Sequence, residues 1–300
     1  MMYAPISFPG LGLEIDPVQT LELGPISIHM YGVVIALGLM LAVFYGCARS
    51  REFGMSIDDL TDGALCIIPF AILCARLYYC AFEWDTYKDN PISVLYIWNG
   101  GLAIYGGVIG AALGIVVFGL VKKIKIGAVL DITSLGFLIG QSIGRWGNFF
   151  NREAFGAETD SLLRMGLFKR VTDAGGIFDS TIMYYYHPTF LYESIWNAVG
   201  FLLLHFLSKK RKYDGQVALG YLAWYGLGRT FIEGLRTDSL YWGNLRVSQI
   251  LAAVTCFVGV ALLMFQGFRE HDPAALQANI YAAKLEAQAA EENEEAEENE

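Results

Sequence analysis

Apolar residues occur along this chain in long runs that polar connections separate. The runs lie at about residues 28–48, 61–82, 101–121, 129–150, 189–207, 216–234 and 247–267. About 20 apolar residues in a helix cross the roughly 30 Å hydrocarbon core of a bilayer. The pattern therefore predicts an all-α polytopic membrane protein, a bundle of about seven transmembrane helices.

The composition also favours a membrane protein. The chain has 300 residues, of which 55% are hydrophobic and 17% charged, and its mean hydropathy is +0.42. Soluble domains carry about a quarter charged residues. The net charge of −9 arises largely in the final segment EENEEAEENE, so the body of the chain is close to neutral. Because the chain has neither a basic patch nor a nucleic-acid motif, we expect no nucleic-acid partner.

The five cysteines lie in or beside apolar runs and form no CxxC pair. We interpret them as small packing residues, and we expect no disulfide framework, metal site or cofactor. No Lys or Arg occurs before Arg49, whereas a secretory signal peptide needs a basic first region. The first apolar run is therefore predicted to remain as a transmembrane helix.

Basic residues are concentrated in alternate connections, which predicts the orientation in the membrane. One set of short connections holds Arg49, Arg51, Lys122, Lys123, Lys125, Lys209, Lys210, Arg211 and Lys212. We expect these connections on the cytoplasmic side. The chain then divides into an extracytoplasmic segment 1–27, a membrane domain 28–267 with an extracytoplasmic cap at 151–188, and a cytoplasmic acidic tail 268–300. The N-terminus would lie outside and the C-terminus in the cytoplasm.

Two further patterns concern local structure. Asp272 and Pro273 are typical of a helix start, so we expect a short helix there, followed by a disordered glutamate run. Small residues recur every four positions in two spans, at Gly106, Gly110 and Gly114 and at Gly136, Gly140 and Gly144. Such stripes let helix backbones approach closely in lipid. We expect these two spans to lie in the interior, for example packed on each other.

Three arginines, Arg76, Arg145 and Arg229, lie within apolar spans. An arginine at the bilayer centre costs about 2.5–3.5 kcal/mol on the insertion scale, whereas a leucine offsets only about 0.5 kcal/mol. We interpret Arg76 as a packing or pairing residue. Arg145 and Arg229 lie toward the ends of their spans, and their presence indicates ionic partners or a water-filled cavity.

Polar residues accompany these two arginines at helical spacing. The first set, in GRWGNFFNREAFG, is Arg145, Asn148, Asn151, Glu153 and Gly156. The second set, in YGLGRTFIEGLR, is Tyr225, Arg229, Glu233 and Arg236. Each spacing places most of its set on one helical face. For the second set, an internal Arg229–Glu233 pair that lets the helix lie among other helices is an alternative to a binding site.

Two shorter motifs lie at the same predicted membrane face. HMYG places Tyr31 at the start of the first span, and HPTFLYES places His187 and Glu193 at the start of the fifth. Each motif alone is also typical of an interfacial anchor. Because the outward ends of these spans and of the arginine-bearing spans meet at one depth, we expect a cavity at headgroup level. Arginine binds phosphate oxygens bidentately, so such a cavity suits a phosphate diester.

The longest motif resembles a family signature. GRWGNFFNREAFG is similar to that of bacterial prolipoprotein diacylglyceryl transferases, and HMYG, WNGGLAIYGG, HPTFLYE and YGLGRTFIEGLR agree in order, from about Gly24 to Gln249. The resemblance implies a transferase of the bacterial plasma (inner) membrane that works without a cofactor. Its donor would be phosphatidylglycerol and its acceptor the lipobox cysteine of a prolipoprotein. The products would be a thioether and glycerol phosphate, in the first step of lipoprotein maturation.

The resemblance also implies roles for particular residues. Arg145 would bind the donor phosphate with Arg229, and the rest of the pocket would comprise Tyr31, Asn148, Glu153, Gly156, His187 and Glu233. Many members have a histidine, a candidate base for the thiol, where this chain has Tyr105. An ordinary phenol, with a pKa of about 10, ionises less readily than a thiol, with a pKa of about 8.5. We therefore expect Tyr105 to form a hydrogen bond, and His187 and Glu153 are candidate proton acceptors.

A secondary transporter or channel for an anionic or lipid substrate is the alternative. Such a protein would also use buried arginines, but transporters commonly contain internal repeats. The chain shows no repeat, and its longest polar connection occurs once. Its polar residues are also gathered at one face of the membrane instead of lining the whole depth. These features favour the transferase.

Overall fold

The chain folds into two compact units. A computed structural model describes residues 5–24, 26–97, 100–172, 178–237, 241–243 and 245–298. The first unit comprises Met1–Ala42, Leu135–Leu207 and Leu219–Arg269. The second unit comprises Val43–Ser134, Ser208–Ala218 and Glu270–Glu300.

Long helices occur at every position where the apolar runs predict them. Their bounds are α1 Met30–Arg49, α2 Ile57–Phe82, α4 Ile104–Lys122, α5 Ile126–Asn151, α6 Thr189–Ser208, α7 Gln216–Leu235 and α8 Val247–Gly267. Six of them are long and apolar enough to cross a membrane, within the part of the chain that the structure describes. The polar side chains of Arg229 and Glu233 lower the hydropathy of α7, which is outside these six. The prediction of a multi-pass helical membrane protein is confirmed.

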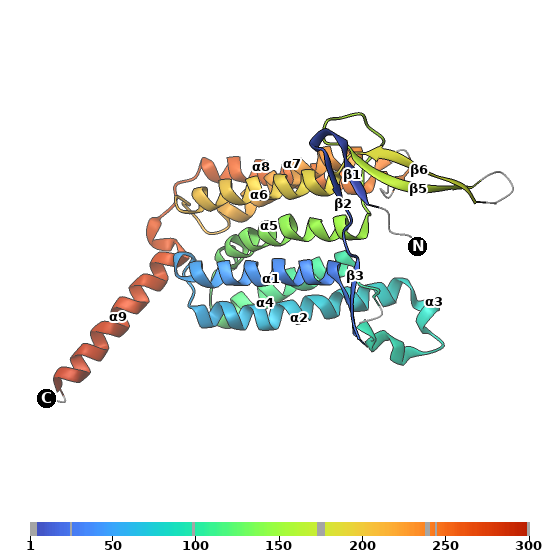
Figure 1. Ribbon diagram of the computed structural model, residues 1–300. Helices are drawn as coiled ribbons and strands as arrows, with labels where there is room; N and C mark the ends of the chain where they lie inside the picture. The colour runs from blue at the N-terminus through green and yellow to red at the C-terminus, as the bar shows by residue number, and fades with distance from the viewer. Residues whose placement is uncertain are drawn as a thin grey trace. The chain divides into compact units, whose positions relative to one another are not determined.

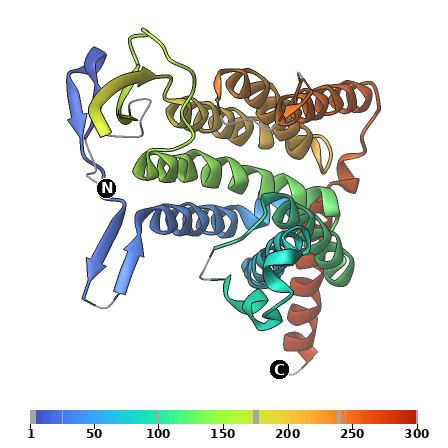
Figure 2. The same ribbon diagram turned by 90° about the vertical axis from the view of Figure 1, so that its right-hand side faces the viewer.

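In the first unit, α5, α6, α7 and α8 run side by side, with the start of α1 along α5 (Figures 1 and 2). Glycines permit the close crossings. A Cβ added at Gly226 of α7 would lie 2.6 Å from the backbone nitrogen of Cys256 in α8. One added at Gly38 of α1 would lie 3.4 Å from Gly140 of α5. Such contacts between backbones stabilise helix pairs in lipid, where the hydrophobic effect between helices is lost.

A pair of tryptophans fixes α6 against α7. Trp196 Nε1 donates to the Trp224 carbonyl at 3.0 Å, and Trp224 Nε1 donates to the Trp196 carbonyl at 2.9 Å. The two rings are stacked with centroids 4.4 Å apart. Each ring lies over a glycine of the other helix, Trp196 over Gly228 and Trp224 over Gly200. We call this arrangement the tryptophan pair; it sets the register between the two helices.

The first unit also contains a small sheet at one end of these helices (Figure 1). Its strands are β1 Ile6–Phe8, β2 Leu13–Ile15, β5 Met165–Thr172 and β6 Phe178–Tyr186, in the order β2-β1-β5-β6. Two further hairpins are β3 Thr20–Leu23 with β4 Ile26–His29 and β7 Tyr241–Trp242 with β8 Leu245–Arg246. The sequence predicted a cap at 151–188, where β5 and β6 lie, but it gave no indication of the strands in the first 27 residues.

An apolar cluster joins this sheet to α5 and α6. Its members are Ile6, Phe8, Phe149, Met165, Leu167, Tyr186 and Phe190. Phe149 belongs to the end of α5 and Phe190 to the start of α6, and their rings lie 5.2 Å apart. Burying each such side chain stabilises the fold by about 1.5–3 kcal/mol. The cap is therefore packed on the helix ends that carry the polar residues described below.

The second unit is built on α2 and α4. The glycine stripe of α4 packs on α2: a Cβ at Gly106 would lie 2.5 Å from the Cys74 carbonyl, and one at Gly110 would lie 2.6 Å from Cys74 Cβ. The stripe of α5 instead meets α1, where Gly136 faces Ala42 at 3.5 Å. Each stripe is thus a helix contact within its own unit, and the packing of the two stripes on each other stays a prediction.

Arg76 of α2 organises the segment that leads into α4. Its side chain is 3% exposed, and its guanidinium donates to the carbonyls of Ser93, Val94, Tyr96, Gly100 and Gly101 at 2.7–3.3 Å. The short helices of this segment are α3 Trp84–Tyr87 and η3 Pro91–Leu95. The packing role predicted for Arg76 is thus confirmed, with backbone carbonyls as its partners.

The segment after α8 is tied to the second unit by Gln277. Asp272 caps the short helix η5 Pro273–Ala275, as predicted, and α9 Gln277–Glu298 follows. The Gln277 side chain donates to the Gly54 carbonyl and accepts from the Lys125 backbone, and its own backbone N–H donates to Asp214. The glutamate run was expected to be disordered, but α9 continues to Glu298 because Ala and Glu are strong helix formers.

Candidate functional site

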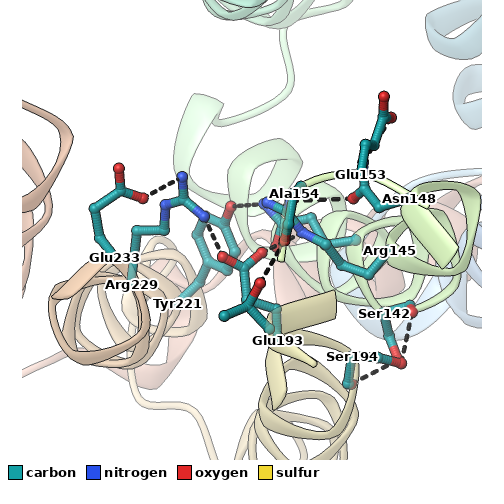
Figure 3. Close-up of polar contacts among 12 residues, drawn as sticks. Ser142, Arg145, Asn148, Glu153, Ala154, Glu193, Ser194, Tyr221, Arg229 and Glu233 are labelled. Carbon is teal, nitrogen blue, oxygen red and sulfur yellow. Dashed lines mark hydrogen bonds and ion pairs between the residues drawn. The ribbon is translucent and has the colours of Figure 1, made fainter. Parts of the chain in front are cut away.

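Two buried glutamates and two half-buried arginines form a cluster that joins three helices of the first unit (Figure 3). Arg145 lies near the end of α5, Glu193 near the start of α6, and Arg229 with Glu233 near the end of α7. Glu193 Oε2 pairs with Arg145 Nε, and Glu193 Oε1 pairs with Arg229 Nη1. Arg229 Nη2 pairs with Glu233 Oε2 at 2.5 Å. We call these residues the ion-pair cluster.

The members of the ion-pair cluster differ in exposure. The carboxylates are the more buried, with 4% of the Glu193 side chain and 2% of the Glu233 side chain exposed. Arg145 is 23% exposed and Arg229 is 16% exposed. Two positive and two negative charges make the cluster neutral, which lowers the cost of burying it. Arg145 is therefore the cation that an incoming anion can reach most easily.

A chain of polar side chains continues from Arg145 to the end of α5 (Figure 3). Arg145 Nη1 lies 3.4 Å from Asn148 Oδ1, and Asn148 Nδ2 donates to Glu153 Oε1 at 3.1 Å. Asn151 Nδ2 donates to the same oxygen at 3.2 Å. The helix α5 continues through Asn151. The three-residue spacing thus places both amides beside Glu153, which is exposed.

Hydrogen bonds next to Glu193 hold α6 against α5. Ser194 Oγ donates to the Ser142 carbonyl at 2.8 Å, and Ser142 Oγ donates to the Ser194 carbonyl at 2.9 Å (Figure 3). Trp146 Nε1 donates to Ser194 Oγ at 3.1 Å. These bonds place the Glu193 backbone firmly beside Arg145. The sequence offered no signal for them, because serines in apolar spans are commonly packing residues.

Gly156 and His187 lie where three segments cross. The Gly156 backbone N–H donates to the His187 carbonyl at 2.9 Å. A Cβ at Gly156 would lie 2.8 Å from both His187 Cβ and the Leu235 carbonyl oxygen, so only glycine fits. The His187 ring is half-buried, and its Nδ1 lies 3.3 Å from the Tyr192 hydroxyl. Gly156 therefore serves the close crossing of the chain beside the end of α7.

The two tyrosines of the predicted site belong to different units. Tyr31 lies in the first turn of α1 in the first unit, where its exposed ring packs over Gly147, the neighbour of Asn148. Tyr105 is exposed at the start of α4, in the second unit. The ion-pair cluster therefore lies in the same unit as Tyr31, whereas Tyr105 belongs to the other unit. Trp98 and Asn99, in the motif before Tyr105, lie outside the described residues.

Glu193 is the residue that sequence reasoning undervalued. It was interpreted as part of an interfacial anchor, whereas the structure places it between both arginines. A carboxylate one turn inside an apolar span is the signal that points to such a partner. Among the described residues, no group of three or more His, Cys, Asp and Glu side chains could hold a metal ion.

The fold and the ion-pair cluster define a multi-pass membrane protein with paired arginines where three helices end. The sequence profile of the family described as "Prolipoprotein diacylglyceryl transferase" matches residues 18–265. A Listeria welshimeri protein is 40% identical over 265 residues, which are 88% of this chain and 95% of that protein. A Streptococcus sanguinis protein is 44% identical over 261 residues, 84% of this chain and 96% of that one. Both are named phosphatidylglycerol--prolipoprotein diacylglyceryl transferase.

The chain therefore belongs to the prolipoprotein diacylglyceryl transferase family and is a transferase of lipoprotein biosynthesis. The family match covers the whole ion-pair cluster, Tyr31 and Tyr105. It ends before Gln277 and α9, which lie beyond the matched residues.

Proposed function

We propose that this chain transfers the diacylglyceryl group of phosphatidylglycerol to the lipobox cysteine of a prolipoprotein. The observation that carries the proposal is that Arg145 of α5 and Arg229 of α7 meet at Glu193, in a chain that belongs to this family. Two guanidinium groups so placed match the oxygens of a phosphate diester. The products are a thioether and glycerol phosphate, and the chemistry needs no cofactor because the donor contains its own leaving group.

The reaction moves negative charge from sulfur to phosphate. The cysteine thiolate attacks the glycerol carbon of the donor, the carbon–oxygen bond breaks, and its electron pair leaves with the phosphate. Cations fixed beside the phosphate stabilise this charge in the transition state more than in the ground state. Arg145 is the more exposed of the two cations and makes the first contact with the donor. Arg229 completes the contact from α7.

The remaining site residues support these two arginines. Asn148 lies between Arg145 and Glu153 and orients the guanidinium, and Glu233 holds Arg229. Tyr31 lines the site over Gly147. The thiol proton passes to a carboxylate or imidazole, for which Glu153 and His187 are the candidates. Tyr105 would form a hydrogen bond to the donor or to the thiol.

We place the protein in the bacterial plasma (inner) membrane, with the ion-pair cluster toward the outer face. The N-terminal segment 1–27 and the cap 151–188 are then extracytoplasmic, and the tail 268–300 is cytoplasmic. The alternation of basic connections supports this orientation. A prolipoprotein whose signal peptide crosses the same bilayer would present its cysteine at the depth of the helix ends.

The direct test is a transfer assay with the purified chain. The full chain is incubated with phosphatidylglycerol and a synthetic lipobox peptide, and the peptide mass is followed by mass spectrometry. We expect a mass increase of one diacylglyceryl group, together with released glycerol phosphate. A peptide with serine in place of the cysteine is the matched control and should remain unmodified. Folded protein that leaves the cysteine peptide unmodified would contradict the proposal.

A further inference from the structure

Glu193 is the carboxylate that pairs with both Arg145 and Arg229, within the part of the chain that the structure describes. One carboxylate oxygen faces each guanidinium, as in a bidentate bridge (Figure 3). Glu233 contacts Arg229 from the same helix. Glu193 thus holds two like charges together, which would otherwise repel each other in a medium of low polarity.

The contacts of the arginines leave little room for a second anion that also bridges them. Arg229 presents Nη1 to Glu193 and Nη2 to Glu233. Arg145 presents Nε to Glu193 and Nη1 toward Asn148. A phosphate that bridged both guanidinium groups would need the positions that the two Glu193 oxygens occupy. Carboxylate and phosphate use the same fork geometry on arginine, so the two anions are competitors.

We propose that Glu193 competes with the phosphate of donor and product for Arg145 and Arg229, and that its return to them promotes product release. This inference rests on the proposed function. The donor phosphate diester carries one negative charge, whereas the glycerol phosphate that leaves is a monoester with greater negative charge near neutral pH. The product would therefore bind the two arginines more tightly than the donor does. A carboxylate that competes for both arginines would promote the release of this tightly bound product.

The surroundings of Glu193 restrict how it moves. Its neighbour Ser194 is bonded to Ser142 and Trp146 of α5, so the helix backbone stays in place. The tryptophan pair, in which Trp196 follows Ser194 by two residues, fixes α6 to α7. Exchange of Glu193 for phosphate is therefore a rotation of the side chain. It would leave the arginines at the positions that α5 and α7 define.

Competition and structural support make opposite predictions for Glu193→Gln. If Glu193 competes with phosphate, glutamine, which carries no charge, should let phosphate bind more tightly. If Glu193 only positions the arginines, its loss should weaken binding. Glu193→Asp keeps the charge but shortens the side chain, so it reaches one arginine poorly. Glu233→Gln is the matched control. It removes the same charge, but Glu233 pairs with only one of the two arginines, Arg229, whereas Glu193 pairs with both.

The test measures dissociation constants in detergent micelles for phosphatidylglycerol and for glycerol phosphate, together with steady-state rates. We expect Glu193→Gln to bind glycerol phosphate at least tenfold more tightly, which is about 1.4 kcal/mol. Its kcat and KM should fall together, with a burst of product in the first turnover, because release becomes limiting. Glu193→Asp should bind about threefold more tightly, and Glu233→Gln should change the constant less than threefold.

Two results would overturn the inference. One is unchanged or weaker binding in Glu193→Gln and Glu193→Asp, which would make Glu193 a purely structural support. The other is equal tightening in Glu193→Gln and Glu233→Gln without tightening in Glu193→Asp, which would make net charge the cause. If Glu193→Gln does not fold, the affinity of Glu193→Asp for glycerol phosphate decides between the two interpretations, since this variant keeps the charge in the ion-pair cluster. A wild-type protein that binds phosphatidylglycerol but makes no thioether would defeat the proposed function and leave this comparison intact.

Discussion

At the scale of single residues, Arg145 and Arg229 share one carboxylate but have different surroundings. Arg229 lies between two buried glutamates, and Arg145 lies between Glu193 and an amide chain that ends at exposed Glu153. Removing one member of a buried ion pair leaves a charge without compensation and typically costs about 3–5 kcal/mol. Substitutions of the two arginines should therefore separate activity from stability.

Arg145→Ala should reduce transfer by about 10²–10³-fold, or about 2.7–4 kcal/mol, while the protein stays folded. Arg145→Lys should also fail, because lysine cannot reproduce a bidentate phosphate contact. Arg229→Ala should lose both activity and stability, because Glu193 and Glu233 then lose a shared partner. Transfer rates and unfolding in detergent provide the measurements. Near-normal turnover in both alanine variants would exclude a phosphate-binding arginine pair.

Tyr105 is the position where the chain departs from the family pattern. Tyr105→Phe should retain substantial activity, reduced about tenfold, with the pH dependence of the rate unmoved, since an ordinary phenol is a weak source of negative charge. The pH–rate profiles of wild type, Tyr105→Phe and Tyr105→His provide the comparison. A fall of 10³ or more in folded Tyr105→Phe, rescued by histidine, would instead show that the phenol carries the proton transfer.

At the scale of elements, the tryptophan pair couples the register of α6 and α7 to the ion-pair cluster. Gly228 lies directly before Arg229, and Trp196 lies one turn after Glu193. The two helices cannot slide without breaking the reciprocal hydrogen bonds. A substitution at this crossing should therefore displace Arg229, although Arg229 itself is unchanged.

Gly228→Ala should lower both stability and transfer. The added methyl group would lie 2.1 Å from Trp196 Nε1, so α6 and α7 must separate, at a typical cost of about 1–3 kcal/mol. We expect transfer to fall at least tenfold as Glu193 and Arg229 move apart. Gly234→Ala on the same helix is the matched control, since its nearest atom is the end of the flexible Gln249 side chain at 3.4 Å. Equal effects of the two substitutions would refute the coupling.

Periodicity made the long helices predictable, because each apolar run has the length of a membrane span. The Arg229–Glu233 pair and the amides of α5 followed from helical spacing for the same reason. Glu193 could not be assigned a partner, because its contacts come from two other helices. The pairing of β1 with β5 was also missed, since the paired residues lie more than 150 positions apart along the chain. Spacing along the chain reports contacts within an element and not those between elements.

At the scale of the whole molecule, the orientation in the membrane is the first property to test. A reporter that is active only outside the cytoplasm should work when fused near Gly175, which lies outside the described residues, and should fail near Lys210. The asymmetry of the basic connections is the reason. The opposite pattern would place the ion-pair cluster at the cytoplasmic face.

Asp214, between α6 and α7, links stability of the second unit to pH. Burial raises the pKa of its carboxyl, against the Gln277 backbone hydrogen bond and the nearby Lys125 and Arg211. The folded state then holds this proton more strongly than the unfolded state, so stability should fall as pH rises from about 4 through the raised pKa. Asp214→Asn should remove this dependence and match or exceed wild-type stability at pH 8. Unfolding in detergent at several pH values measures it.

The contacts of Gln277 also bear on how the protein is made. Gln277 binds Gly54, Lys125 and Asp214, which belong to three separate connections, and it follows all of them along the chain. A ribosome synthesises these connections first, so they lack their hydrogen bonds to Gln277 until that residue has been added. Closure of the second unit is therefore a late step of biogenesis, and insertion of the preceding helices into the bilayer has to proceed without it.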